Sequence, residues 1–136
     1  MTDIVKEAET VIKELQVKRI DRKTGKERYV LEMKTTQIRK FLTAVNKLNN
    51  EVGVYKSQHL NAETLPRDIS AQIQFLKVKA AYQMGREKTV EKFMNKAGIP
   101  AKIDAIGDSI KAYEEFAHYI EALVAYHKYY DNGGKD

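Results

Sequence analysis

Hydrophobic residues recur at helical spacing along most of the chain, which predicts a succession of amphipathic helices. The first helix is expected to begin near the N-terminus, where Thr2 or Asp3 can supply the oxygen of an N-cap. The second is expected to begin at Thr35 or Thr36 and to run to about Val54. Each helix has one apolar stripe, made by Ile4, Val5, Ala8, Val11, Ile12 and Leu15 in the first and by Ile38, Phe41, Leu42, Val45, Leu48 and Val52 in the second.

The third predicted helix, residues 67–87, has two apolar faces. It follows Pro66, a residue well suited to the first turn of a helix. At about 100° per residue, one face comprises Ile69, Ile73, Leu76, Ala80 and Met84, and the other comprises Ala71, Phe75, Val78 and Tyr82. A helix with two apolar faces is expected to be sandwiched inside a bundle.

The rest of the chain predicts further helices. "KTVEKFMNKAGIP" is typical of a short helix that ends at Gly98, and "AKIDAIGD" continues the chain. Ser109 is placed to cap a long helix that runs to about Tyr130 and is closed by "DNGG". Its apolar face comprises Ile110, Tyr113, Phe116, Ala117, Ile120, Leu123, Val124 and His127. We therefore predict an all-α fold, a compact bundle of about five helices, as a single domain over residues 1–136.

A basic segment connects the first two helices. "VKRIDRKTGKERYVLEM", residues 17–33, carries six basic residues and has Thr24 and Gly25 near its middle. Its weak periodicity fits a loop or a short hairpin and does not distinguish between them.

The net charge of +5 is concentrated around this segment. Residues 17–60 hold 11 basic and 4 acidic residues, whereas residues 61–136 hold 11 of each. A local positive field attracts a polyanion such as a nucleic acid or an anionic membrane. From charge alone, a solvated basic loop explains the excess equally well.

Cations also form narrow strips on the second and third helices. One strip of the second helix has no acidic member, whereas Lys40 and Lys47 share another strip with Glu51. The acid-free strip is Arg39, Thr43, Asn46 and Asn50; the strips of the third helix are Gln72, Lys79, Gln83 and Arg86, and Gln74 with Lys77. Such strips suit sequence-independent binding of an RNA backbone.

No constellation for catalysis or metal binding is present in the sequence. The chain has no Cys, His59 lies in a predicted loop, and His118 and His127 point to opposite sides of one helix. Glu114 and Glu115 diverge by about 100°. Phosphate-binding glycine motifs are absent as well. We expect no enzyme activity, no metal and no cofactor. The N-terminus lacks a basic segment followed by an apolar core, so a cytoplasmic protein is expected.

Three segments together resemble the small-subunit family of the Csm complex, the type III-A CRISPR effector. They are "KTTQIRKFLTAVNKL", "FLKVKAAYQMGRE" and "YIEALVAYHKYY", and their order and spacing cover most of the chain from Lys34 to Gly134. The resemblance implies an all-helical, non-catalytic subunit. Several copies would stack as a filament beside the backbone subunits that hold the CRISPR RNA, with target RNA in the groove between the filaments. Cleavage would belong to the backbone and large subunits.

The resemblance carries over seven cations of the matching motifs as candidates: Lys34, Arg39, Lys40, Lys77, Lys79, Arg86 and Lys128. Arg39 is the first candidate for a phosphate contact, because its strip lacks acids and a guanidinium can bind phosphate through two bonds. Arg86 and Lys79 follow, and then Lys34 and Lys40. Lys77 is expected to meet solvent or another subunit.

Two other functions remain open at this point. The first is a protein scaffold whose cations bind acidic surfaces of other subunits, without direct RNA contact. The second is a small ribonuclease that uses His118 or His127, for which the sequence provides no converging partner.

Overall fold

The computed structural model describes the backbone of residues 3–133 and the side chains of residues 3–131. The elements in chain order are α1 (Ile4–Leu15), β1 (Val17–Ile20), β2 (Glu27–Val30), the 3₁₀ turn η1 (Thr35–Ile38), α2 (Arg39–Gln58), α3 (Arg67–Arg86), α4 (Lys88–Ala97), α5 (Ile99–Ile106) and α6 (Ile110–Gly133). The prediction of an all-α fold is confirmed, since the two strands form only one short hairpin. The described part of the chain has six α-helices where about five were predicted, because α5 is a separate helix.

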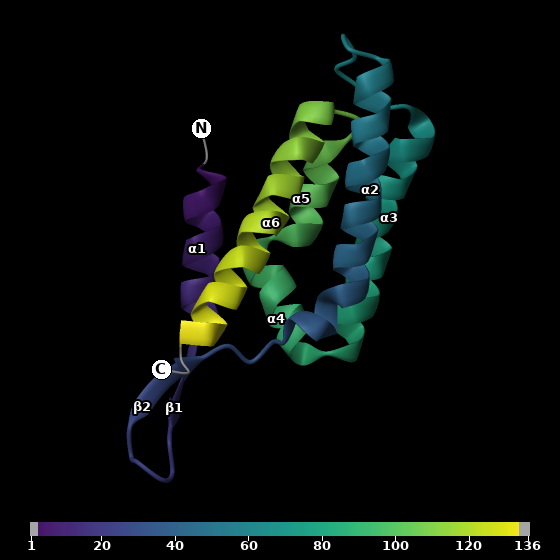
Figure 1. Ribbon diagram of the computed structural model, residues 1–136. Helices are drawn as coiled ribbons and strands as arrows, with labels where there is room; N and C mark the ends of the chain where they lie inside the picture. Colours follow the sequence, from purple (N-terminus) through teal and green to yellow (C-terminus); the bar gives the residue numbers. More distant parts are fainter. Residues whose placement is uncertain (1–2, 134–136) are drawn as a thin grey trace.

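The long helix α6 lies between two helical groups (Figure 1). On one side it packs against α1, and on the other side α2 and α3 run antiparallel as neighbours. The short helices α4 and α5 connect α3 back to α6. All six helices contribute buried side chains to the hydrophobic core, with Ile12, Phe41, Ile73, Met94, Ile103 and Tyr113 among the most deeply buried. Within residues 3–133, no helix is both long enough and apolar enough to cross a membrane.

The helix starts follow the expected capping rules only in part. One carboxylate oxygen of Asp3 accepts hydrogen bonds from the amides of Val5 and Lys6, each at 3.1 Å, and caps α1. Thr2, the other candidate cap, lies outside the described residues. The predicted threonine cap of the second helix is wrong. The chain instead enters α2 through the 3₁₀ turn η1. At the start of η1, the side-chain oxygen of Gln37 accepts a hydrogen bond from the amide of Lys34.

The third helix differs from its predicted environment. Its first apolar face is buried, as expected. The second face is on the surface, because Phe75, Val78 and Tyr82 are 54%, 54% and 59% exposed. The expectation that α3 is sandwiched inside the bundle is therefore wrong. Helical spacing identifies an apolar face but does not tell what covers it.

The predicted end of α4 and start of α6 agree with the structure, whereas the predicted end of α6 does not. Gly98 ends α4 in the left-handed region at φ +67°, and the Ser109 side chain accepts from the amide of Ala112 at the start of α6. Helix α6 continues to Gly133, beyond the predicted end at Tyr130. Gly134, the last residue of the predicted closing sequence, lies outside the described residues.

The basic connecting segment forms a β-hairpin, which decides between the two predicted alternatives. Strands β1 and β2 pair antiparallel in a register that sets Val17 opposite Val30 and Ile20 opposite Glu27. The hairpin extends away from the helices, at the end of the molecule where α6 finishes (Figure 1). After it, Leu31 and Met33 are buried and return the chain to the core.

Candidate nucleic-acid interface

A groove of about 700 Å³ lies between α2 and α3. Its lining residues come from both helices: Arg39, Lys40, Thr43, Ala44, Lys47, Leu48, Ala71, Gln72, Phe75, Leu76 and Lys79. Buried Leu48 and Leu76 provide an apolar floor, while the polar residues on the rims are exposed. The antiparallel packing of α2 against α3 therefore creates an elongated surface with an apolar base and polar edges.

The charge of this groove has one sign. Its lining contains four cations, Arg39, Lys40, Lys47 and Lys79, and no acidic residue. Among the side chains of residues 3–131, none of these four cations has a carboxylate within ion-pair distance. No ion pair among the described side chains therefore offsets these four charges, and their positive field favours an anionic ligand.

Aromatic rings lie beside the cations on the exposed face of α3. The Lys79 ammonium is 5.9 Å from the centre of the Phe75 ring, and the Arg86 guanidinium is 5.7 Å from that of Tyr82. Each cation follows its ring by four positions, about one helical turn. Such contacts restrain the long side chains on the helix surface without removing their charge.

Three of the five predicted RNA-binding residues come together in the groove. Arg39 and Lys40 reach it from α2, and Lys79 reaches it from α3. Arg86 lies farther along α3, outside the groove lining. Lys34 also lies outside it, 3.9 Å from a carboxylate oxygen of Asp131.

Sequence reasoning did not select Lys47, although it lines the groove with the others. Lys47 shares a strip of α2 with Glu51, so the sequence suggests local neutralisation. In the structure, Glu51 lies instead beside a different hollow near Tyr55 and Pro66, and it forms no ion pair with Lys47. Two signals for Lys47 were present in the sequence: it lies within the first matching motif, and α3 has no acidic residue between Asp68 and Glu87.

Lys77, on the opposite side of α3, has a partner within the chain. Its ammonium forms an ion pair with the carboxylate of Asp104 in α5. Since both side chains are partly exposed, the pair is expected to contribute little to stability. Its charge is nevertheless balanced locally, unlike the charges of the groove.

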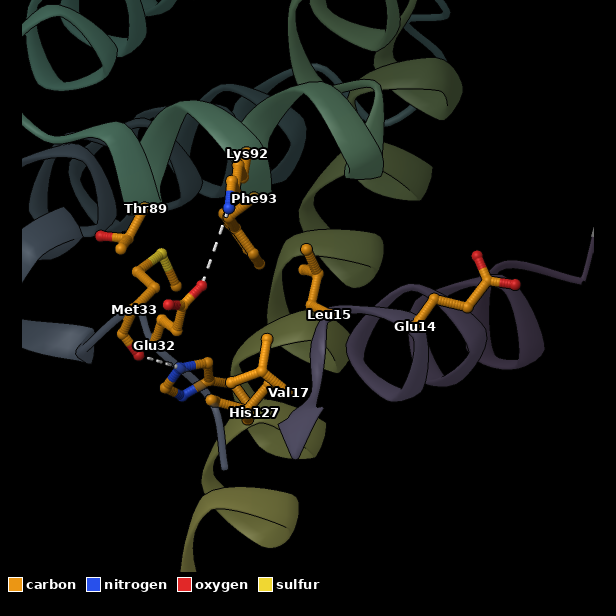
Figure 2. A pocket seen from close by; sticks show the side chains of 10 residues that line it. Glu14, Leu15, Val17, Glu32, Met33, Thr89, Lys92, Phe93 and His127 are labelled. Carbon is orange, nitrogen blue, oxygen red and sulfur yellow. Dashed lines mark hydrogen bonds and ion pairs between the residues drawn. The ribbon is translucent and has the colours of Figure 1, made fainter. Parts of the chain in front are cut away.

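A smaller cavity of about 160 Å³ lies where α1, the hairpin base, α4 and α6 meet, and His127 is one of the residues that line it (Figure 2). His127 is 4% exposed, and its Nε2 atom lies 2.7 Å from the main-chain oxygen of Met33. The Lys92 ammonium lies 3.8 Å from Glu32 at the same cavity. His118 is exposed elsewhere on α6. The two histidines therefore do not converge on one site.

The resolved pKa shifts belong to tyrosines outside the groove. Burial, with a smaller effect of the Glu51 charge, raises the pKa of Tyr113. Burial, together with Glu7, likewise raises the pKa of Tyr119. The hydrogen bond that Tyr130 donates to Glu9 raises the pKa of Tyr130 to about 12. Each shift stabilises the neutral phenol, so these side chains act as structural hydrogen-bond donors at neutral pH.

The fold and this groove define a small helical protein with an open, acid-free cationic surface. Within the described residues, no group of three or more His, Asp or Glu side chains is placed to hold a metal ion. A family model described as Csm2 Type III-A matches residues 1–133. The chain therefore belongs to the Csm2 family of type III-A CRISPR systems, which confirms the family indicated by the sequence motifs.

Curated relatives agree with this assignment. The protein "CRISPR system Cms protein Csm2" of Mycobacterium tuberculosis is 35% identical over 129 residues, which cover 95% of this chain and 92% of the relative. The protein of the same name from Streptococcus thermophilus is 37% identical and covers 84% of this chain and 83% of the relative. The one from Enterococcus italicus is 32% identical, with coverage of 85% and 82%.

Proposed function

We propose that the chain is a non-catalytic small subunit of a type III-A CRISPR effector complex that binds the backbone of guide or target RNA through the groove between α2 and α3. Family membership supports a place in such a complex. The observation that carries the RNA contact is the groove itself, where four cations stand without an acidic residue in the described lining. Phosphates are the ligands that such a surface attracts independently of sequence. The complex would operate in the cytoplasm.

Within this proposal, Arg39, Lys40, Lys47 and Lys79 contact phosphates directly. Arg86 extends the contact along α3, because it lies seven positions after Lys79 and thus on the same side of the helix. Lys34 remains a prediction from the sequence motif only, since it lies near Asp131 and away from the groove.

The second part of the proposal is self-association as a filament. The exposed apolar face of α3, formed by Phe75, Val78 and Tyr82, supports this part because contiguous apolar surface commonly marks a protein contact. The same face also favours the alternative function, a scaffold that holds other subunits without touching RNA. The two functions differ in what the groove cations do.

A reconstituted complex can test the RNA contact. We expect the double variant Arg39→Glu and Lys79→Glu to retain target RNA at least roughly tenfold more weakly, since two phosphate contacts become repulsive. The control is a double variant with the same change of charge, Lys6→Glu and Lys111→Glu, at exposed lysines outside the groove. Size-exclusion chromatography and circular dichroism would verify assembly and helicity. Unchanged RNA retention with failed assembly would instead support the scaffold.

A further inference from the structure

The β-hairpin of residues 17–30 contributes charge and almost no core. Its side chains from Lys18 to Tyr29 are all exposed, and only Val17 and Val30 at its base are partly buried. It holds six basic and two acidic residues. A two-stranded hairpin is only marginally stable by itself. Packing therefore does not account for the positive charge carried along this arm, which projects from the helices (Figure 1).

The register of the hairpin places two arginines directly opposite each other. Arg19 of β1 pairs with Arg28 of β2, so both side chains emerge on the same face. Like charges in this position repel and destabilise a hairpin. Glu32 lies 3.4 Å from Arg19, whereas Arg28 has no carboxylate within ion-pair distance among residues 3–131. An anion bound at this face would contact both guanidinium groups and relieve their repulsion.

The opposite face of the hairpin carries a paired charge and exposed apolar side chains. Lys18 lies there, and its ammonium is 2.8 Å from a carboxylate oxygen of Glu27, so the charge is balanced. Ile20 and Tyr29 share this face and are 65% and 57% exposed. A protein partner would be expected to dock on this apolar face, and an anion on the arginine face.

The turn adds three exposed cations on a hydrogen-bonded backbone. A carboxylate oxygen of Asp21 accepts from the Lys23 amide at 2.8 Å, and the Asp21 amide donates to the Lys26 carbonyl at 2.8 Å. The Asp21 carbonyl accepts from the amide of Gly25, whose φ of +71° closes the turn. The one acid of the turn is thus engaged with the backbone, while the side chains of Arg22, Lys23 and Lys26 are exposed.

We propose that the hairpin is a second RNA-binding arm, in which Arg19 and Arg28 bind a phosphate of single-stranded RNA and the turn cations bind its neighbours. This inference rests on the proposed function, because it assumes that the chain meets RNA, but it concerns a surface outside the α2–α3 groove. Arginine suits the role because its planar donors bind phosphate through two bonds. Charged edge strands also discourage aggregation. That purpose, however, does not require two like charges in direct opposition.

Arg28→Glu provides a sharp test, because it should weaken RNA binding without lowering the stability of the protein. The new carboxylate faces Arg19 across the hairpin, so the thermal unfolding midpoint should stay the same or rise. The affinity of the full-length chain for single-stranded polyuridylate should fall by about fivefold at low salt. The slope of log affinity against log salt should become shallower by about 0.7 or more, as expected for one lost phosphate contact.

Tyr29→Ser is the matched control, since it alters the adjacent residue on the opposite face. It should leave RNA affinity and its salt slope unchanged. Unchanged affinity in Arg28→Glu, or no binding of polyuridylate by the wild-type chain at low salt, would overturn the RNA arm. If Arg28→Glu instead fails to enter the effector complex while its RNA affinity is normal, the arm binds protein and the inference is wrong.

The groove variant Arg39→Glu and Lys79→Glu separates this inference from the proposed function. If only that variant binds RNA more weakly, the groove is supported as an RNA-binding site and the hairpin is not. Weaker binding by Arg28→Glu alone would sustain the arm and reject the groove.

Discussion

The imidazole of His127 joins the last turns of α6 to the main-chain oxygen of Met33, which lies 2.7 Å from Nε2 and 94 positions earlier in the chain. Met33 belongs to the segment between the hairpin and η1. Because the carbonyl only accepts, Nε2 carries the proton, and Nδ1 is left to accept from the Thr35 hydroxyl at 3.4 Å. The buried ring thus fixes the path of the chain into α2, and both of its nitrogens lie against partners within the protein.

Replacing His127 by Phe should therefore destabilise the protein without affecting RNA cleavage by the complex. The ring volume is largely kept, but the Met33 carbonyl loses its donor inside the core, so we expect a loss of about 1–3 kcal/mol in the free energy of unfolding. Urea unfolding measures this loss. His118→Phe, at an exposed position of the same helix, should change stability by less than about 0.5 kcal/mol. Loss of RNA turnover in a complex that contains folded His127→Phe subunits would support the alternative function, a ribonuclease that uses His127.

Stability should decrease at alkaline pH because of the buried tyrosines. Tyr113 donates to Asn49 at 2.6 Å, and burial keeps its pKa above the usual value of 10. The unfolded chain consequently releases this proton at a lower pH than the folded protein does. The stabilisation is fully present below about pH 10 and is lost progressively as the pH rises above it.

Tyr113→Phe removes this contribution and its pH dependence. At about pH 7 we expect the variant to be less stable by about 1 kcal/mol, because the hydrogen bond to Asn49 is lost. Above about pH 10 the difference in stability between the variant and wild type should shrink. At that pH the unfolded wild-type chain ionises Tyr113 while the folded protein does not, which lowers the stability of wild type. Urea unfolding across this pH range measures both quantities. A constant difference would show that Tyr113 does not titrate with folding.

The boundaries that the sequence predicted well are those controlled by local chemistry. Asp3 caps α1 through its own side chain, Ser109 caps α6, and Gly98 ends α4 with a positive φ. Each depends on residues only a few positions apart. The start of α2 was predicted less well, because Thr35 is directed to His127, 92 positions away, and not to the amides of its own helix.

The role of Gly98 can be separated from packing by a matched pair of substitutions. A methyl group on Gly98 would meet no atom within 4 Å, so Gly98→Ala tests only the backbone conformation at φ +67°. We expect a loss of about 1 kcal/mol in the free energy of unfolding. A methyl group on Gly53, within α2, also meets no atom within 4 Å, and Gly53→Ala should stabilise the protein by about 0.5–1 kcal/mol. Thermal or urea unfolding of both variants measures the contrast; the same sign for both would contradict this explanation.

The candidate site was predictable in its residue types but not in its extent. Arg39, Lys40 and Lys79 were selected from helical strips and motif matches, and all three line the groove. Lys47 lies in the first matching motif but was not selected, and its place beside the other three follows from the packing of α2 against α3, which spacing within one helix does not contain. The cross-strand opposition of Arg19 and Arg28 likewise depends on the register of the hairpin, which the sequence left open.

If copies of the chain associate through the exposed apolar face of α3, a charge placed on that face should weaken their association. Val78 is 54% exposed between Phe75 and Tyr82, so Val78→Asp should leave the isolated fold nearly as stable as wild type. It should nevertheless reduce association between copies, because a carboxylate in the centre of an apolar contact must be desolvated. Analytical ultracentrifugation of the free chain and subunit stoichiometry of the purified complex measure the effect.

Val54→Asp is the matched control, since Val54 is 56% exposed on α2 and lies outside the α3 face. Both substitutions add the same charge at similarly exposed positions of helices. If α3 carries the contact between copies, only Val78→Asp lowers the number of subunits per complex. Equal losses in the two variants would point to a general effect of added negative charge, and no loss in either would reject this face as the contact. RNA retention per incorporated subunit should stay unchanged in Val78→Asp, because Val78 does not line the groove; a parallel fall would mean that filament contact and RNA binding share one surface.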